Sequence, residues 1–325
     1  MKNRITIGLV LIIQFACQQN DVNTVQASID LEAASQTTTL LGENLVSTPL
    51  YERDLAISPK LDEIIYTLGD YKQNRRCLVG TKKINGKWSE PEVLNISGKH
   101  QDIEPFYVSE RNRLYFSSNR PIFNDSTRTD YNIWYSDRIA GVWSEPIALD
   151  TAINKKGNEF FPSLSSNGNL YFTATREDGI GKEDIFVAKL SNGKYEKPEP
   201  LPEALNTPLF EFNAFISPNE DYLIFNSFGR EDGMGGGDLY VSQKDHQGLW
   251  QKSRNLGSKI NSEKLDFCPF VDNESLNFYF TSERTNGIKD KLTTVRELRE
   301  RANTIENGFG NIYKIAFSEL GIKKE

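Results

Sequence analysis

Residues 158–198 read NEFFPSLSSNGNLYFTATREDGIGKEDIFVAKLSNGKYEKP and predict four short β-strands in succession. The first strand, Phe160–Leu164, ends at a turn around Ser166–Gly168. The segment Leu170–Ala174 then alternates apolar and polar residues, which is the period of a half-buried strand. After a Gly-rich loop, Asp184–Ala188 is the third predicted strand, and the fourth follows it. A sheet of four such strands is too small to bury its own face, so it needs copies of itself.

The chain contains such copies at a period of about fifty residues. The second strand recurs as an apolar and aromatic triplet in five units: Ile64–Tyr66, Leu114–Phe116, Leu170–Phe172, Leu223–Phe225 and Phe278–Phe280. The third strand recurs as Asn132–Trp134, Asp184–Phe186, Asp238–Tyr240 and Asn311–Tyr313, with a weaker copy at Cys77–Val79. A Gly-x-aromatic start of the fourth strand recurs at Trp88, Trp143, Tyr195 and Trp250. We therefore predict an all-β fold, a single β-propeller of five four-stranded blades. Six blades would need a further unit, which we do not find.

The fifth unit stops after its third strand, near Phe317, and its missing fourth strand is predicted at the other end of the chain. Leu41–Leu45 resembles Leu256–Ile260, the segment that follows a fourth strand, so residues 36–40 are the predicted fourth strand of the last blade. Pairing the two ends in one sheet closes the ring and removes two exposed strand edges. The propeller domain is therefore predicted to cover residues 36–320.

The N-terminus resembles a bacterial lipoprotein signal peptide that spans residues 1–16. Lys2 and Arg4 form a positive region, and Ile5–Phe15 is an apolar segment too short to span a bilayer as a helix. Cys17 follows a small residue directly after this segment and is the predicted lipidation site. Ordinary secretion, with Cys17 present by chance, is the alternative.

Residues 17–35 are polar and lack periodicity, so we expect a flexible tether there, and residues 321–325 are a short C-terminal tail. The residue after the predicted lipidation site is Gln18 and not Asp, which by resemblance to lipoproteins favours the outer membrane. Gln14 departs from the lipoprotein pattern, which has an aliphatic residue at that position. We expect an outer-membrane lipoprotein of a bacterial cell envelope, attached to the membrane through its lipid anchor only.

The chain has a formal charge of −7, which becomes −9 if the signal peptide with its two positive residues is removed. An acidic domain without a basic patch is not expected to bind nucleic acid. Cys77 and Cys268 fall on strands that are not neighbours within a blade, which predicts buried free thiols. Both histidines, His100 and His246, lie in connecting segments, so zinc sites and His-dependent triads are excluded. We expect a monomer without a cofactor; the Gly-rich loops make a weak case for Ca²⁺, since they do not match an EF-hand loop.

An acid stands at the start of the first strand in every unit: Glu52, Asp102, Glu159, Glu211 and Asp266. The first strand of a propeller blade lines the central channel, so these carboxylates are predicted to form a ring around one mouth of the channel. Such a ring suggests a cation, a sugar or a basic peptide as ligand.

A recurring arginine supports a structural role for the same acids. It stands at the end of the second strand in four units, as Arg120, Arg176, Arg230 and Arg284. The positions of Glu159 and Arg176 are symmetric about the predicted turn, so the two residues are expected to face each other across the hairpin. Opposite charges on adjacent strands contribute ~0.2–1 kcal/mol. Four of the five acids are therefore better explained as ion-pair partners than as catalytic groups.

The first unit breaks this pattern, because Asp70 falls where the arginine is expected. Glu52 then faces an acid, with only Lys72 or Arg75 within reach. Glu52 and Asp70 are therefore the leading candidates for carboxylates that act on a ligand.

Two of the loops between second and third strands are longer than the others, at residues 121–131 and 285–310. The second contains a predicted helix that begins with a capping box at Thr294–Glu297. Both loops leave the face on which the first strands begin. They are predicted either to carry partner specificity or, for the helix, only to cover its own blade.

The repeat between Glu52 and Leu320 resembles the TolB-type, WD-repeat-like (PD40) propeller repeat. The resemblance rests on five features in order: Leu-Tyr-Phe-x-Ser, an Arg, a Gly-rich loop, Asp-Ile-Trp and Gly-x-Trp-Ser-Glu-Pro. The resemblance implies a propeller of the kind found in envelope proteins that bind other proteins. We expect a non-enzymatic binding or scaffold module for a protein, peptide or glycan. The alternative is a glycoside hydrolase or lyase, which needs two carboxylates in unequal environments about 5–10 Å apart. A purely structural envelope component is a third possibility.

Overall fold

The stretch that predicted the fold forms one antiparallel sheet. Its strands are β12 (Glu159–Leu164), β13 (Leu170–Ala174), β14 (Asp184–Ala188) and β17 (Glu199–Pro200), in that order. A turn closes the first hairpin, where the N–H of Gly168 donates to the carbonyl of Ser165 at 2.9 Å and Gly168 has a φ of 82°. All residues of β13 are buried, because both faces of the sheet pack against neighbouring sheets. The sheet is one blade of a propeller.

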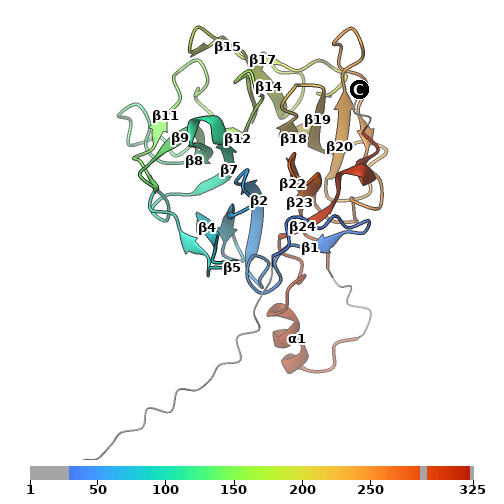
Figure 1. Cartoon of the computed structure of the whole chain (residues 1–325). Helices are drawn as coiled ribbons and strands as arrows, with labels where there is room; N and C mark the ends of the chain where they lie inside the picture. The colour runs from blue at the N-terminus through green and yellow to red at the C-terminus, as the bar shows by residue number, and fades with distance from the viewer. Residues whose placement is uncertain (1–28, 286–290, 323–325) are drawn as a thin grey trace, which may run out of the picture.

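In the computed structural model, which describes residues 29–285 and 291–322, five such blades are arranged in a ring about a central axis (Figure 1). Blade 3 is the sheet above. Blade 1 contains β2 (Tyr51–Ile57), β3 (Glu63–Gly69), β4 (Arg76–Ile84) and β6 (Glu92–Val93); blade 2 contains β7 (Asp102–Val108), β8 (Arg113–Ser118), β9 (Asn132–Ile139) and β11 (Ile147–Ala148). Blade 4 contains β18 (Phe210–Ile216), β19 (Tyr222–Phe228), β20 (Asp238–Gln243) and β21 (Arg254–Asn255); blade 5 contains β22 (Asp266–Asp272), β23 (Asn277–Ser282), β24 (Asn311–Ala316) and β1 (Thr39–Leu40). The predicted five-bladed, all-β fold is confirmed.

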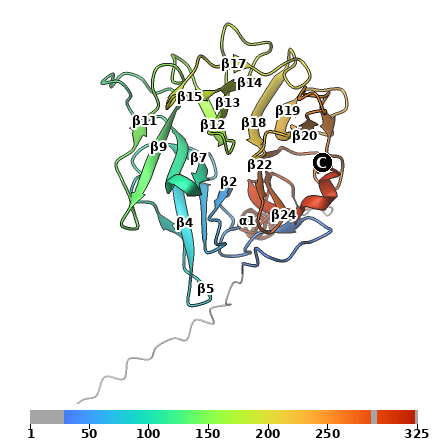
Figure 2. The same ribbon diagram turned by 45° about the horizontal axis from the view of Figure 1, so that its top comes forward.

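The two ends of the chain meet in blade 5. Strand β1 pairs antiparallel with β24, Thr39 opposite Lys314 and Leu40 opposite Tyr313. The N–H of Leu41 extends this ladder by donating to the carbonyl of Ile312 at 2.9 Å. The innermost strands complete the ring, because β22 also contacts β2. The predicted closure by the N-terminal strand is confirmed (Figure 2).

The fourth strand of each blade is shorter than the sequence suggested. In blades 1 and 2 the Gly-x-Trp segments form return arms of hairpins with the third strand, as β5 (Lys87–Trp88) and β10 (Val142–Trp143); in blade 3, β15 (Leu190–Ser191) pairs with β16 (Lys194–Tyr195). A proline follows each arm, at Pro91, Pro146 and Pro198. Proline has no N–H for the ladder, so pairing stops there and resumes as a two-residue strand.

The blades are held together by apolar side chains between neighbouring sheets. Each recurring aromatic of the Gly-x-aromatic segments packs against the blade before its own. Trp143 of blade 2, for example, lies in one cluster with Ile65 and Leu78 of blade 1. A tryptophan with this role is core and not a platform for a ligand.

The segment before β1 is part of the propeller. Ile29 and Leu31 are buried in the cluster between blades 5 and 1. The carbonyl of Ile29 accepts from Trp88 Nε1 at 3.0 Å, and that of Leu31 accepts from Asn277 Nδ2 at 2.8 Å. Residues 29–31 of the predicted tether therefore belong to the propeller, and the tether's residues 17–28 lie outside the described residues. The predicted signal peptide and Cys17 lie outside the described residues.

Three short helices complete the part of the fold that the structure describes. The 3₁₀-helices η1 (Ser109–Arg111) and η2 (Phe317–Leu320) follow strands, and α1 (Val295–Ala302) lies in the blade 5 insertion, away from the ring (Figure 1). The capping box predicted at Thr294–Glu297 is present. Helix α1 has no buried residue, so it does not cover its own blade. Within the described ranges, no helix is long and apolar enough to cross a membrane.

Candidate functional site

The five acids at the starts of the innermost strands are almost completely buried, with exposed fractions of 0–1%. In four of the blades the acid also accepts hydrogen bonds from the connecting segment that precedes its strand. Glu211, for example, accepts from the N–H and the hydroxyl of Thr207 at 2.7 and 2.8 Å. In blade 2 the corresponding contact is from the hydroxyl of Ser97 to Asp102, at 2.8 Å. Glu159 Oε2 is buried without a hydrogen-bond partner, and the other oxygens of these acids accept bonds inside the fold. Because all five carboxylates are buried, they do not form an open ring for a ligand.

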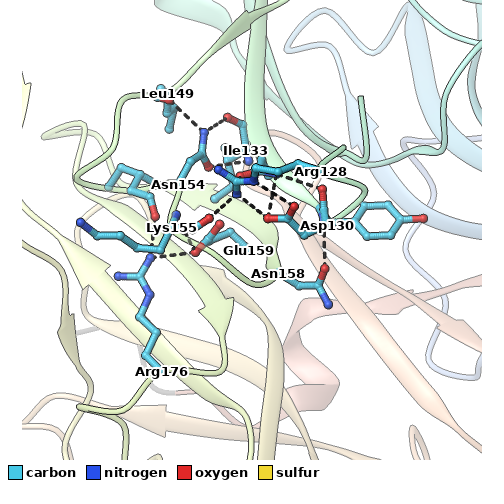
Figure 3. A network of polar contacts seen from close by, with 12 residues as sticks. Arg128, Asp130, Ile133, Leu149, Asn154, Lys155, Asn158, Glu159 and Arg176 are labelled. Atoms are coloured by element: carbon cyan, nitrogen blue, oxygen red, sulfur yellow. Dashed lines mark hydrogen bonds and ion pairs between the residues drawn. The ribbon is translucent and has the colours of Figure 1, made fainter. Parts of the chain in front are cut away.

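The structure contains the four acid–arginine ion pairs, with N–O distances of 2.6–3.1 Å: Asp102–Arg120, Glu159–Arg176, Glu211–Arg230 and Asp266–Arg284. In each pair the arginine also donates to a carbonyl of the connecting segment and lies over aromatic rings of its own blade. Figure 3 shows the ion pair of blade 3, in which Arg176 extends to Glu159. Each arginine thus ties together the first strand, the connecting segment and the second and third strands.

The register of these hairpins differs from the predicted one. The residue directly opposite the acid is a small one, Ser118, Ala174, Ser227 or Ser282, and the arginine lies two or three residues further along the chain. A β-bulge in the first strand of these blades lowers the index sum by one and accounts for one residue of the shift; the rest comes from the position of the turn. The arginine reaches back to the acid from the end of the second strand.

Blade 1 lacks the arginine, and its acid has other partners. Glu52 accepts from Thr48 and from Asn311 Nδ2 of blade 5, the latter at 2.8 Å. Burial raises the pKa of Glu52 to about 7. The residue opposite Glu52 is Leu68, not Asp70, whose carboxylate accepts from N–H groups of its own turn. The prediction that Glu52 faces an acid is therefore wrong.

The bulge in each first strand creates a second ring, two residues after the acid. Its members are Asp54, Glu104, Phe161, Asn213 and Cys268, and all five have a left-handed backbone, with φ between 49° and 61°. This conformation costs roughly 1 kcal/mol or more for a residue other than glycine. The backbone geometry repeats five times, whereas the side chains are all different. A side chain that is the same in every blade is explained by packing. Side chains that differ from blade to blade on the same backbone geometry are better candidates for function.

These side chains meet at the axis of the ring. Arg53 of blade 1 donates from Nε to Asp54 at 3.0 Å and from Nη2 to Glu104 of blade 2 at 3.0 Å. Asn213 of blade 4 also approaches Glu104, with Nδ2 3.4 Å from Oε1. Glu104 is further held by the N–H of Phe161 of blade 3 at 2.7 Å. One guanidinium and two carboxylates therefore form a rigid network that joins four blades.

Arg53 is itself an exception among the repeats. The other blades have an apolar residue at its position: Ile103, Phe160, Phe212 and Phe267. Its guanidinium lies 4.9 Å from the ring centroid of Phe267 and 3.6 Å, from Nη2, from the sulfur of Cys268. A single cation at a repeat position that is otherwise apolar is therefore the sequence signal of this network.

A cavity of about 250 Å³, the channel cavity, opens beside this network. Its walls combine the aromatic rings of Tyr131, Phe160 and Phe212 with polar groups of Arg53, Glu104, Asn213 and Glu183. Glu183 precedes β14, and within the described part of the chain its carboxylate has no hydrogen-bond or cation partner. Burial and the nearby carboxylates of Glu104 and Asp184 raise the pKa of Glu183 to about 7.

A second cavity, the blade 1–2 groove, has a volume of about 740 Å³. The loop after β3, the segment before β7 and the blade 2 insertion form it, and its lining includes Asp70, Arg75, Lys99, His100 and Arg128. Arg76 lines both cavities. The predicted insertion at residues 121–131 therefore does contribute to a concave surface, and Asp70 lies on that surface.

Cys77 and Cys268 are both free, Cys268 buried and Cys77 half-buried. Burial raises the pKa of each thiol. Among the described residues, no group of three or more His, Cys, Asp and Glu side chains has an arrangement that could hold a metal ion.

The sequence matches no protein-family model and no curated protein. Solved structures share its fold at low identity. A structure of BT0996 in complex with RGII has a TM-score of 0.54 at 8% identity, over 87% of this protein and 92% of that one. TolB from Acinetobacter baumannii has a TM-score of 0.42 at 10% identity, and the match covers 80% of this protein and about half of TolB, 53%. An endo-arabinase from Bacteroides thetaiotaomicron VPI-5482 has a TM-score of 0.46 at 16% identity, over 73% of this protein and 91% of that enzyme. These likenesses concern the propeller fold, and the function must be argued from the residues.

Proposed function

We propose that this chain is a lipid-anchored β-propeller of a bacterial cell envelope that binds a glycan in the channel cavity without cleaving it. The observation that carries the proposal is the lining of the cavity, in which aromatic rings and fixed polar groups face the same space. The apolar face of a sugar ring packs on aromatic side chains, and its hydroxyls donate to carboxylates and amide oxygens. Pockets with a largely apolar wall and a few placed polar groups are typical of small-ligand sites.

The central carboxylates favour binding over catalysis. Asp54 and Glu104 share Arg53, so both are held by one buried cation. The ring acids are buried, and each is held by backbone or side-chain donors, four of them by an arginine; Glu159 Oε2 alone among their oxygens lacks a hydrogen-bond partner. A glycosidase needs one carboxyl group that keeps its proton and a second that is free to act as base or nucleophile. Asp54, Glu104 and the ring acids are all held by donors inside the fold, so they are poorly suited to act as the base or nucleophile.

One observation favours the alternative, a glycoside hydrolase. Glu183 has the property of a general acid, because burial and its acidic neighbours raise its pKa to about 7. Glu104 is the other acid that lines this cavity, so it is the candidate for the second carboxylate. This reaction would require Glu104 to act while it is bound to Arg53, and for this reason we place it second.

The two functions are separated by one titration series. The chain from residue 29 onward is titrated calorimetrically with neutral and acidic oligosaccharides, including RGII fragments, and each mixture is then assayed for new reducing ends. We expect binding without product, and weaker binding by Glu183→Gln. Glu177→Gln is the matched control, since Glu177 lies in the same loop but is exposed. Product release by the wild type that Glu183→Gln abolishes would make the chain an enzyme. Absence of binding by any glycan would overturn the proposal in favour of a protein partner.

A further inference from the structure

The blade 1–2 groove is positively charged, although the chain as a whole has a charge of −7. Its lining contains the cations Arg75, Arg76, Lys99 and Arg128 and one acid, Asp70. Arg128 is neutralised by Asp130, at an Nε–O distance of 3.0 Å. The carboxylate of Asp70 accepts the N–H groups of Lys72 and Asn74, at 3.1 and 2.8 Å. The positive charge of the groove therefore comes from Arg75, Arg76 and Lys99.

Arg76 is the most informative of these cations, because it is partly buried and lies where the groove meets the channel cavity. Its guanidinium is held by neutral groups. It lies 5.4 Å from the ring centroid of Tyr131, donates to the Tyr131 hydroxyl through Nη2, and donates through Nε to Gln101 at 3.3 Å. No acid of the described chain lies within ion-pair distance of it. A partly desolvated guanidinium with no carboxylate partner is suited to bind one from a ligand.

Arg75 and Lys99 extend this charge along the groove towards solvent. Both side chains are exposed, and neither makes an ion pair with the residues that the structure describes. The lining also contains the amide and hydroxyl side chains of Asn74, Asn119 and Thr129. The groove therefore offers several positive charges together with neutral hydrogen-bonding groups.

We propose that the glycan bound by this protein is acidic, with the carboxylate of a uronic acid on Arg76 and further carboxylates along the groove towards Arg75 and Lys99. The inference rests on the proposed function, since it places the next sugar of the same chain in the channel cavity. An acidic peptide would meet Glu104 and Glu183 there, which repel its carboxylates. A uronic acid can direct its hydroxyls to those two acids and its carboxylate to Arg76. It therefore matches both the acidic and the basic side chains at this site.

The test compares short oligogalacturonides with the same oligomers after reduction of their carboxyl groups. Titration calorimetry is done with the wild type and with the double variant Arg75→Gln/Lys99→Gln, which changes exposed residues only. The control is Lys87→Gln/Lys194→Gln, which removes the same charge from two exposed hairpin positions outside the groove. Hexaglutamate serves as the acidic peptide.

We expect the groove variant to bind the acidic oligomers about ten-fold more weakly and the reduced oligomers unchanged. The control variant should bind both like the wild type. Arg76→Lys should also lose affinity for the acidic oligomers, because an ammonium cannot replace a forked guanidinium. Raising the salt concentration should weaken only the acidic complexes.

Other outcomes would overturn the inference. Equal affinity for acidic and reduced oligomers, or an equal loss in the groove and control variants, would remove the role of the groove and leave the channel cavity as the glycan site. Preference for hexaglutamate would assign the groove to an acidic peptide. Failure of every oligosaccharide to bind would reject the proposed function as well, so the two failures are distinguishable.

Discussion

Removing a single arginine of the repeated ion pairs should destabilise the whole propeller. We consider Arg120→Met in blade 2, since methionine keeps much of the aliphatic volume. Arg120 Nη2 is 2.6 Å from Asp102 Oδ1, and Asp102 is 1% exposed. The variant leaves a buried carboxylate without its cation.

The expected cost follows from that burial. Removing one partner of a buried ion pair typically costs about 3–5 kcal/mol, because the remaining charge is desolvated and unpaired. Arg120 also donates to the carbonyl of Ile96 at 3.1 Å, which loses a partner, whereas Asp102 keeps the hydroxyls of Ser97 and Ser118. We therefore expect a loss of about 3–5 kcal/mol, which lowers the Tm by on the order of 10 °C for a domain of this size.

The assay is urea unfolding followed by tryptophan fluorescence, because Trp134 lies 5.4 Å from the Arg120 guanidinium. Asp102→Asn in the Arg120→Met background should recover part of the loss, since it removes the unpaired charge. Arg113→Met is the control. It breaks a more exposed pair with Asp137, of 2.6 Å, and should cost less than about 1 kcal/mol. If Arg120→Met costs no more than Arg113→Met, the buried ion pair does not stabilise its blade more than an exposed one.

Three further predictions concern stability. Burial raises the pKa of Glu52 from 4.5 to about 7. The contribution of Glu52 to the free energy of unfolding is therefore complete below pH 4.5 and is lost as the pH rises through 7. Glu52→Gln should remove up to about 3 kcal/mol of this pH dependence, measured as the difference in unfolding free energy between pH 5 and pH 8. Deleting residues 1–41 removes β1 and the buried Ile29 and Leu31, each worth about 1.5–3 kcal/mol, and should lower the Tm strongly by circular dichroism, whereas deleting residues 1–28 should leave it unchanged. In Gly181→Ala the new Cβ would lie 2.1 Å from the carbonyl oxygen of Thr207. Gly193→Ala has no neighbour within 4 Å of its Cβ and costs only the roughly 1 kcal/mol of its left-handed backbone, with a φ of 77°. Gly181→Ala should therefore be destabilised more than Gly193→Ala, and equal Tm values for the two would contradict the close approach.

The local signals of the sequence were sufficient for the architecture. The apolar and aromatic triplets specify second strands that are buried on both faces, and their five-fold repetition predicts five blades. The truncated last unit predicts that residues near 36–40 complete blade 5, and β1 does so at Thr39–Leu40. Such features depend on side-chain periodicity and on the need to pair strand edges, and both are visible in a linear chain.

The sequence also identified the partners Asp102–Arg120, Glu159–Arg176, Glu211–Arg230 and Asp266–Arg284, because the two charges recur at a nearly constant spacing. The predicted strand register of these pairs was wrong, and their burial was not predicted. Each bulge adds one residue to the first strand, and the turn position accounts for the rest of the shift; neither was marked in the sequence. Burial of the acids depends on neighbouring blades that are distant in sequence.

The candidate site was decided by the tertiary structure alone. Arg53, Glu104 and Asn213 belong to blades 1, 2 and 4 and meet only because the ring brings its innermost strands to one axis. The blade 1–2 groove likewise combines loops whose charges look ordinary in the sequence. The fold of each blade follows from the short-range pattern of one repeat. The site at the axis combines single residues from several blades, which are far apart in sequence, so no local pattern predicts it.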